Sequence, residues 1–155
     1  TNSGANTSVP GSLASVIGAA MLFASPGTAM AQRTAPPGGA YQKVSALVPL
    51  PDFVPGLGTL YVDPTTLPAG PFLAYDHQGA LVSSIYMIPL KDMNAQKSFT
   101  DLKVGRERVD HVDIVFNAGH PGVAEPHYHM IVWYVPPEHA APARTLRAGP
   151  PGKIV

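Results

Sequence analysis

The sequence predicts an all-β protein, mainly an antiparallel barrel or sandwich, with at most one short helix in the mature domain. Two observations lead to this fold class. The 155 residues include 18 prolines and 15 glycines, and this density interrupts most segments before a helix can form. The apolar residues of the second half instead alternate with a period of two, which is the repeat of a β-strand, and turn sequences separate the alternating segments.

Residues 1–31 have the order of a secretory signal. An apolar run, Leu13–Phe23, is followed by the helix breaker Ser25–Gly27 and by Ala29–Ala31, a small-x-small cleavage site, although no Lys or Arg precedes the run. The run is shorter than the roughly 20 residues that cross a bilayer, so no membrane insertion is expected after cleavage. We therefore expect a periplasmic or secreted protein that begins at Gln32. The alternative is a buried N-terminal helix.

The mature chain divides into three parts. Residues 32–54 are expected to form an extended lead-in and a first strand. Residues 55–137 are expected to form the β domain, which opens with a brief strand at Thr59–Val62. Residues 138–155 form a proline-rich tail.

The clearest hairpin of the β domain pairs Pro71–Asp76 with Ala80–Ile88. Its connection, His77–Gly79, ends in a glycine where a left-handed residue is needed. Neither face of the second strand is polar, so we expect it to be buried on both sides or to lie at a subunit contact. The next segment, Lys91–Leu102, is the one part of the mature chain in which we expect a helix, of two or three turns.

Two further strands are predicted at Val109–Phe116 and His127–Val135. In the first, alternation is expected to direct three apolar side chains toward the core: Val112, Ile114 and Phe116. In the second, the residues that share one face are His127, His129, Ile131, Trp133 and Val135.

Two histidines at the start of the last strand predict a metal site. His127 and His129 leave the same face, so both imidazoles can meet one ion at about 2.0–2.1 Å. His111, on the preceding strand, is the predicted third ligand. His120, on the loop between the strands, is a fourth ligand or a mobile proton carrier. Because Met130 points away from the histidine face, the sequence disfavours copper bound through methionine.

The available ligand atoms restrict which metal ions can bind. Without cysteine, thiolate zinc sites, Fe–S clusters and thiol catalysis are excluded, and an imidazole or imidazole–carboxylate site suits Zn, Cu, Fe or Mn. Asp113 and Glu125 are the carboxylates in reach, and either can orient an imidazole, bind directly or act as general base.

Part of the histidine stretch resembles the first half of the cupin metal motif. Pro126–His129 follows a glycine-bearing loop, and in cupins such a His-x-His is followed a few residues later by Glu. This chain departs from that pattern, because Trp133 stands where the Glu would fall and no second half of the motif follows.

A second resemblance covers residues 55–137. It rests on the hairpin through Tyr86-Met87 and on four short motifs: Tyr61–Pro64, Asp110–Asp113, Gly119–Pro121 and Pro126–His129. With these motifs the chain is similar to a family of small exported bacterial proteins of unassigned activity, typified by a Thermus protein under extracytoplasmic sigma-factor control. The resemblance implies an exported, mainly β, oligomeric protein and supplies no mechanism.

Three functions therefore remain. The first is an exported protein that binds one transition metal through His111, His127 and His129. The second is a small metalloenzyme with the same ligands, hydrolytic or oxidative, in which Glu125 or His120 acts as acid and base. The third is a structural or assembly protein without metal. Ten basic residues balance ten acidic ones without a basic cluster, so we expect no nucleic-acid partner. A homo-oligomer is expected from the resemblance.

Overall fold

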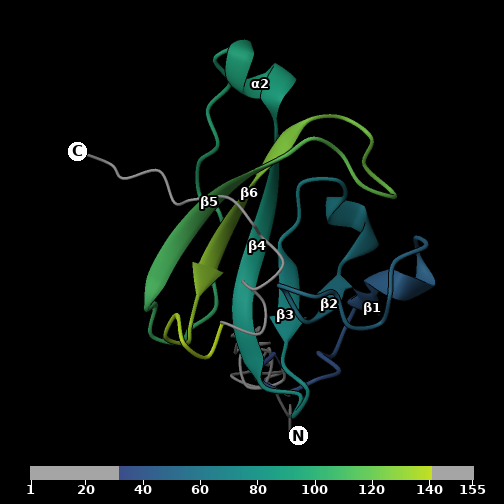
Figure 1. The fold of residues 1–155 in the computed structure, drawn as a ribbon, viewed down its shortest axis with the longest axis vertical. Coiled ribbons are helices and arrows are strands. Elements are labelled where there is room, and N and C mark those ends of the chain that lie inside the picture. The colour runs from purple at the N-terminus through teal and green to yellow at the C-terminus, as the bar shows by residue number, and fades with distance from the viewer. Residues whose placement is uncertain (1–31, 141–155) are drawn as a thin grey trace, which may run out of the picture.

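Residues 32–140 of the computed structural model are described here, so the predicted signal segment and most of the predicted tail lie outside the described residues. Within this range the strands form one antiparallel sheet in the order β1-β2-β3-β4-β6-β5 (Figure 1). The elements are β1 (Gln42–Lys43), η1 (Val44–Ala46), β2 (Thr59–Val62), η2 (Pro64–Thr66), β3 (Phe72–Tyr75), β4 (Leu81–Pro89), α2 (Leu90–Asn94), β5 (His111–Asn117) and β6 (His127–Trp133).

The all-β prediction is confirmed, but the sheet is open rather than closed into a barrel, and no second sheet faces it among residues 32–140. The α-helix is also shorter than the predicted one, with five residues at Leu90–Asn94. The helix ends at Asn94, and Gln96, two residues further on, has a positive φ of 56°, which a continuing helix does not allow. No helix in the described range is long and apolar enough to cross a membrane.

The β3–β4 hairpin forms as predicted, with a connection fixed by Asp76 and Gly79. One carboxylate oxygen of Asp76 accepts hydrogen bonds from the backbone N–H of Gln78 at 2.9 Å and of Ala80 at 2.8 Å. Gly79 has a φ of +78°. Because β4 lies in the middle of the sheet, it is buried on both sides from Leu81 to Met87, as its two apolar faces predict.

Other segments pack against both faces of the sheet. One face carries the main core, and residues 44–57 and the β5–β6 loop pack against it with Val48, Leu57 and Val123. The other face carries a smaller aromatic cluster around Tyr61 and Tyr75. We call the first of these the core face, and it is the face on which His127 and His129 lie. The core face is therefore covered by loops and the short 3-10 helix η1 rather than by α-helices.

One prediction about the edge strand β5 is wrong. Its side chains alternate as expected, but Val112, Ile114 and Phe116 are 50%, 67% and 51% exposed and do not face the core. The register pairs Val115 with His129 and Asn117 with His127, so the other set of β5 side chains lies on the core face. The reason is that β5 lies at the edge of the sheet. The outer face of this edge strand is left uncovered by residues 32–140, and alternation alone does not say which face is covered.

Candidate metal centre

His127 and His129 lie at the start of β6, where the sheet holds them between two strands. The register places Met87 of β4 and Val115 of β5 beside His129, and Asn117 of β5 beside His127. His127 is fully buried and His129 is 5% exposed. Since neighbouring strands fix both Cα positions, the two imidazoles are directed to one side without depending on a mobile loop.

His120 joins them because the β5–β6 loop folds back over the core face. His120 and Val123 exchange two backbone hydrogen bonds of 2.9 Å across Pro121 and Gly122. Proline followed by a glycine with a φ of +89° is the pattern of a type II turn. At the loop's start, the side chain of Asn117 accepts from the N–H of Gly119 at 2.8 Å. The loop thus brings the His120 ring to centroid distances of 4.9 Å from His127 and 5.5 Å from His129.

Backbone carbonyls set the tautomers of two of the imidazoles. His127 Nδ1 lies 2.6 Å from the carbonyl oxygen of Glu125, and His120 Nδ1 lies 2.9 Å from that of Pro121. A carbonyl oxygen only accepts, so each Nδ1 carries the hydrogen and donates it. In the neutral rings the Nε2 atoms are then unprotonated, and each offers a lone pair.

Two of the nitrogens lie at a distance close to that of a metal site. His127 Nε2 and His129 Nε2 are 2.9 Å apart, whereas two nitrogens at 2.0–2.1 Å from a tetrahedral ion would be about 3.3 Å apart. One donor atom from each of His120, His127 and His129 lies within 4.8 Å of the other two. Without an ion, His129 Nε2–H donates to His127 Nε2, so binding an ion at both nitrogens requires that this proton leave or move to Nδ1.

His111 is not part of this cluster, contrary to its prediction as the third ligand. It lies on the core face, but the antiparallel register pairs it with Trp133, at the other end of β6 from His127. Its Nδ1 is 2.8 Å from Asp110 Oδ1, and its ring stacks on Trp133 with the centroids 5.9 Å apart. His120, expected as a fourth ligand or proton carrier, takes the third position instead.

The two carboxylates that the sequence placed in reach have other partners. Glu125 forms an exposed ion pair with Lys91, at 2.7 Å, and this hydrogen-bonded carboxylate raises the pKa of Lys91 above its ordinary value. Only the backbone carbonyl of Glu125 meets the cluster, through His127. Asp113 accepts from Trp133 Nε1 at 3.0 Å. The candidate ligand set of residues 32–140 is therefore made of imidazoles alone.

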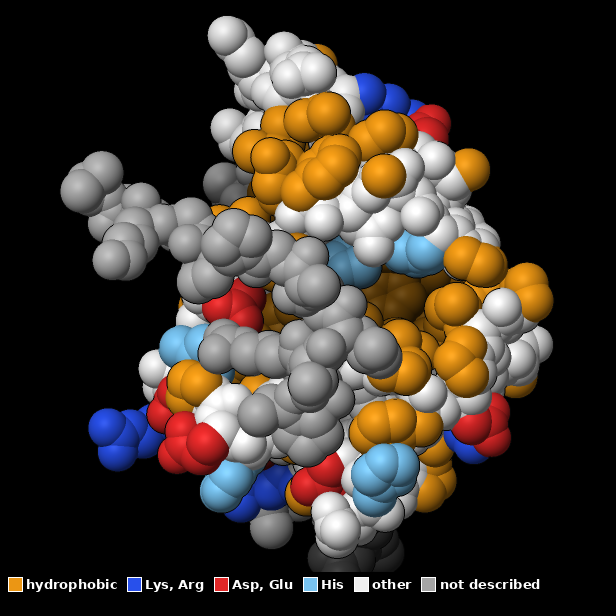
Figure 2. Space-filling view, viewed as in Figure 1, with side chains coloured by type: hydrophobic (Ala, Val, Ile, Leu, Met, Phe, Trp, Pro, Cys, Tyr) orange, Lys and Arg blue, Asp and Glu red, His pale blue; other side chains and the backbone are white. Residues whose placement is uncertain are grey.

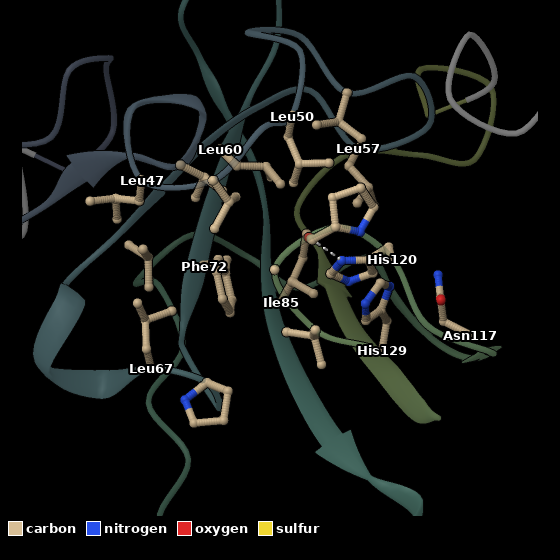
Figure 3. A pocket seen from close by; sticks show the side chains of 18 of the residues that line it. Leu47, Leu50, Leu57, Leu60, Leu67, Phe72, Ile85, Asn117, His120 and His129 are labelled. Atoms are coloured by element: carbon tan, nitrogen blue, oxygen red, sulfur yellow. Dashed lines mark hydrogen bonds between the residues drawn. The ribbon is translucent and has the colours of Figure 1, made fainter. Parts of the chain in front are cut away.

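A cavity of about 400 Å³ opens beside the cluster between the core face and the loops that cover it. Figure 2 shows a hollow bordered by hydrophobic and histidine side chains. In the close view of Figure 3, His120, His129 and Asn117 stand on one side, and the labelled Leu, Ile and Phe side chains line the rest. The described lining residues include no Lys, Arg, Asp or Glu: Val44, Leu47, Val48, Leu50, Val54, Pro55, Leu57, Leu60, Val62, Leu67, Pro68, Phe72, Ile85, Asn117, His120, Pro121, Gly122, Val123 and His129.

Sequence reasoning missed three parts of this site: the cavity, the carbonyl acceptors, and Asn117 as a lining residue. The partner of His111 depended on where the two strands end. The predicted ends, Phe116 and His127, would pair with each other, whereas the structure pairs Asn117 with His127 and therefore His111 with Trp133. The cavity had no local signal, because the lining residues before Leu60 were expected to be lead-in and turns.

Comparison with known proteins gives a relative but no activity. No family profile matches the chain, and a search of curated proteins finds no match. Among solved structures, the hypothetical protein TTHB210 from Thermus thermophilus is 48% identical, with a TM-score of 0.53, over 59% of this chain and 84% of the Thermus chain. The predicted resemblance to a Thermus protein is thus confirmed, whereas sigma-factor control and the cupin likeness stay predictions. The chain belongs to the same protein family as TTHB210.

Proposed function

We propose that this protein binds one transition metal ion through His120, His127 and His129. The observation that carries the proposal is the pair of carbonyl contacts, which hold the Nδ1 hydrogens of His127 and His120 and leave both Nε2 atoms unprotonated beside His129. Metal-ligating histidines are typically held in this way, with the other ring N–H donated to a carbonyl or a carboxylate.

The ligand set favours an ion of the zinc, copper, iron or manganese group. Three neutral imidazoles suit these ions, whereas calcium and magnesium prefer oxygen ligands. Because the cluster has three residues and borders a cavity, at least one coordination position would be left for a non-protein ligand. Such an open position is typical of sites that bind or transform a small molecule.

Elemental analysis of untagged protein tests the proposal. We expect about one metal ion per chain to survive dialysis in the native protein and to be absent from the variant His127→Ala/His129→Ala. The matched control is His77→Ala/His139→Ala, which removes two histidines outside the cluster and should retain the ion. Because His127 is buried, circular dichroism must accompany the measurement, and His129→Gln gives a milder variant if the double variant is unfolded. Absence of bound metal from folded native protein after loading with each ion in turn would reject the site.

A metalloenzyme is the second candidate, and the cavity beside the open coordination position favours it. As a ligand, His120 would not be free to act as acid or base, and the Glu125 carboxylate pairs with Lys91. An enzyme would therefore rely on the metal rather than on these two residues. Metal-dependent hydrolysis of an apolar 4-nitrophenyl ester, lost in His120→Ala, would support it, and equal rates in both proteins would count against it.

Export and self-association complete the proposal. Export is supported by the apolar run Leu13–Phe23 followed by Ala29–Ala31, and fractionation with mass spectrometry should find a periplasmic or secreted chain that begins at Gln32.

Self-association is supported by the uncovered side chains of β5, of which Ile114 is the most exposed. Ile114→Asp should lower the mass measured by sedimentation. An unchanged mass would remove β5 as the contact surface.

A further inference from the structure

The imidazole cluster and the cavity beside it together restrict what a bound ligand can be. Three neutral imidazoles leave the full positive charge of a divalent ion uncompensated by protein ligands. The described cavity lining contributes no carboxylate either. A charge held beside an apolar surface without a counter-charge is costly, so a metal-loaded site favours an anionic group at its open position.

The same lining restricts the rest of the ligand. Apart from Asn117 and the histidines, the described lining side chains are aliphatic, proline or phenylalanine, together with Gly122. The deepest of them are almost fully buried: Leu60, Val62, Phe72 and Ile85 are 8%, 0%, 6% and 2% exposed. A ligand that fills this space must therefore present a hydrocarbon surface, since a polar group there would lose its hydrogen bonds to water without gaining new ones.

From these two restrictions we infer that the cavity binds an alkyl carboxylate, with its carboxylate on the metal held by His120, His127 and His129 and its hydrocarbon chain along Leu60, Phe72 and Ile85. This inference rests on the proposed metal site. Its distinguishing feature is that the head group has no other partner of opposite charge, because no Lys or Arg is among the described lining residues. The metal-free protein should thus discriminate against the anion, and the loaded protein should prefer it.

The test compares octanoate with 1-octanol, which has the same chain length without the charge. Isothermal titration is performed on the full chain, first with Zn(II) alone, then with each ligand in the zinc-loaded and metal-free states. We expect zinc loading to tighten octanoate binding by about tenfold or more, and to change octanol binding by less than about threefold. From hexanoate to octanoate to decanoate, affinity should rise about fourfold per methylene, which corresponds to the roughly 0.8 kcal/mol of a buried CH₂ group.

A pair of matched variants locates the hydrocarbon chain. Leu47 lines the cavity and is 38% exposed, and Met93 lies on α2 outside the lining and is 48% exposed. Leu47→Asp should weaken octanoate binding by about tenfold, through the like charge and the lost apolar contact, while leaving zinc binding intact. Met93→Asp, a change of similar size and exposure, should leave both affinities unchanged.

The outcomes separate this inference from the proposed function. If zinc binds but octanoate binds no better with zinc than without it, the inference is overturned and the metal site stands. If Leu47→Asp and Met93→Asp behave alike, the chain does not occupy this cavity, and the inference is again overturned. If folded protein binds no metal ion, both the proposed function and the inference fail.

Discussion

At each end of β6 a histidine lies on the core face of the sheet, yet the two ends form different chemical environments. At the start of the strand, His127 and His129 meet His120 and backbone carbonyls. At its end, Trp133 stacks on His111, whose Nδ1 contacts the carboxylate of Asp110. The first arrangement gathers three imidazoles that could hold a metal ion, whereas in the second a single histidine contacts a carboxylate and an aromatic ring. The role of a histidine on this face therefore depends on its neighbours in space rather than on its spacing in the sequence.

The largest expected difference between the two ends is in metal affinity. His120→Ala removes a proposed ligand and should weaken zinc binding by at least about 100-fold, since even removing a residue that only orients a ligand costs 10–100-fold. His111→Ala should leave zinc affinity unchanged. Competition with a chromophoric chelator measures both affinities. The reverse pattern would make His111 the ligand and would require a different pairing of β5 with β6.

The second-largest effect is expected at the Trp133 end of β6 and concerns the free energy of unfolding. Asp113→Ala leaves the indole N–H of Trp133 without the acceptor at 3.0 Å, in a side chain that is 2% exposed. We expect the free energy of unfolding to fall by about 1–3 kcal/mol, measured by urea denaturation, with no loss of zinc binding. Asp113→Asn keeps a hydrogen-bond acceptor and should lower the free energy of unfolding by less. If Asp113→Ala abolished metal binding in folded protein, the two ends would not be independent.

A smaller effect is expected from the loop that holds His120. Gly122→Ala places a Cβ at a φ of +89° and 2.8 Å from Val48 Cγ1, so the turn must shift. Gly39→Ala is the matched control, because its φ is +73° but no atom lies within 4 Å of the added Cβ. Each should lower the free energy of unfolding by roughly 1 kcal/mol, and Gly122→Ala by more. Only Gly122→Ala should also weaken zinc binding, and equal zinc affinities would show that the turn does not position His120.

The smallest effect is expected at Glu125. Its carboxylate faces Lys91 at the surface, and only its backbone carbonyl contacts His127. Glu125→Gln should therefore leave zinc affinity within about twofold of the native value, because exposed ion pairs contribute little. It should also return the pKa of Lys91 toward its ordinary value, which NMR titration can follow. A large loss of zinc would mean that the side chain, rather than the main chain, supports the cluster.

The parts of the fold that depend on local chemistry were predictable from the sequence. Prolines and glycines excluded long helices, Asp76 and Gly79 specified the β3–β4 connection, and alternation placed His127 and His129 on one face. Each of these features depends on residues within a few positions of one another. Steric preference and the period of a strand are enough to decide them.

Features that depend on contacts between distant segments could be identified only in the tertiary structure. The face of β5 that is covered follows from its place at the sheet edge, so Ile114 is exposed although its alternation is that of a core residue. The third imidazole follows from how the β5–β6 loop folds back, and the cavity follows from residues 44–57 covering a sheet formed by later segments. The sequence by itself determined where strands and paired imidazoles occur, and packing decided which side chains meet, because periodicity specifies a direction but not the neighbour that lies in it.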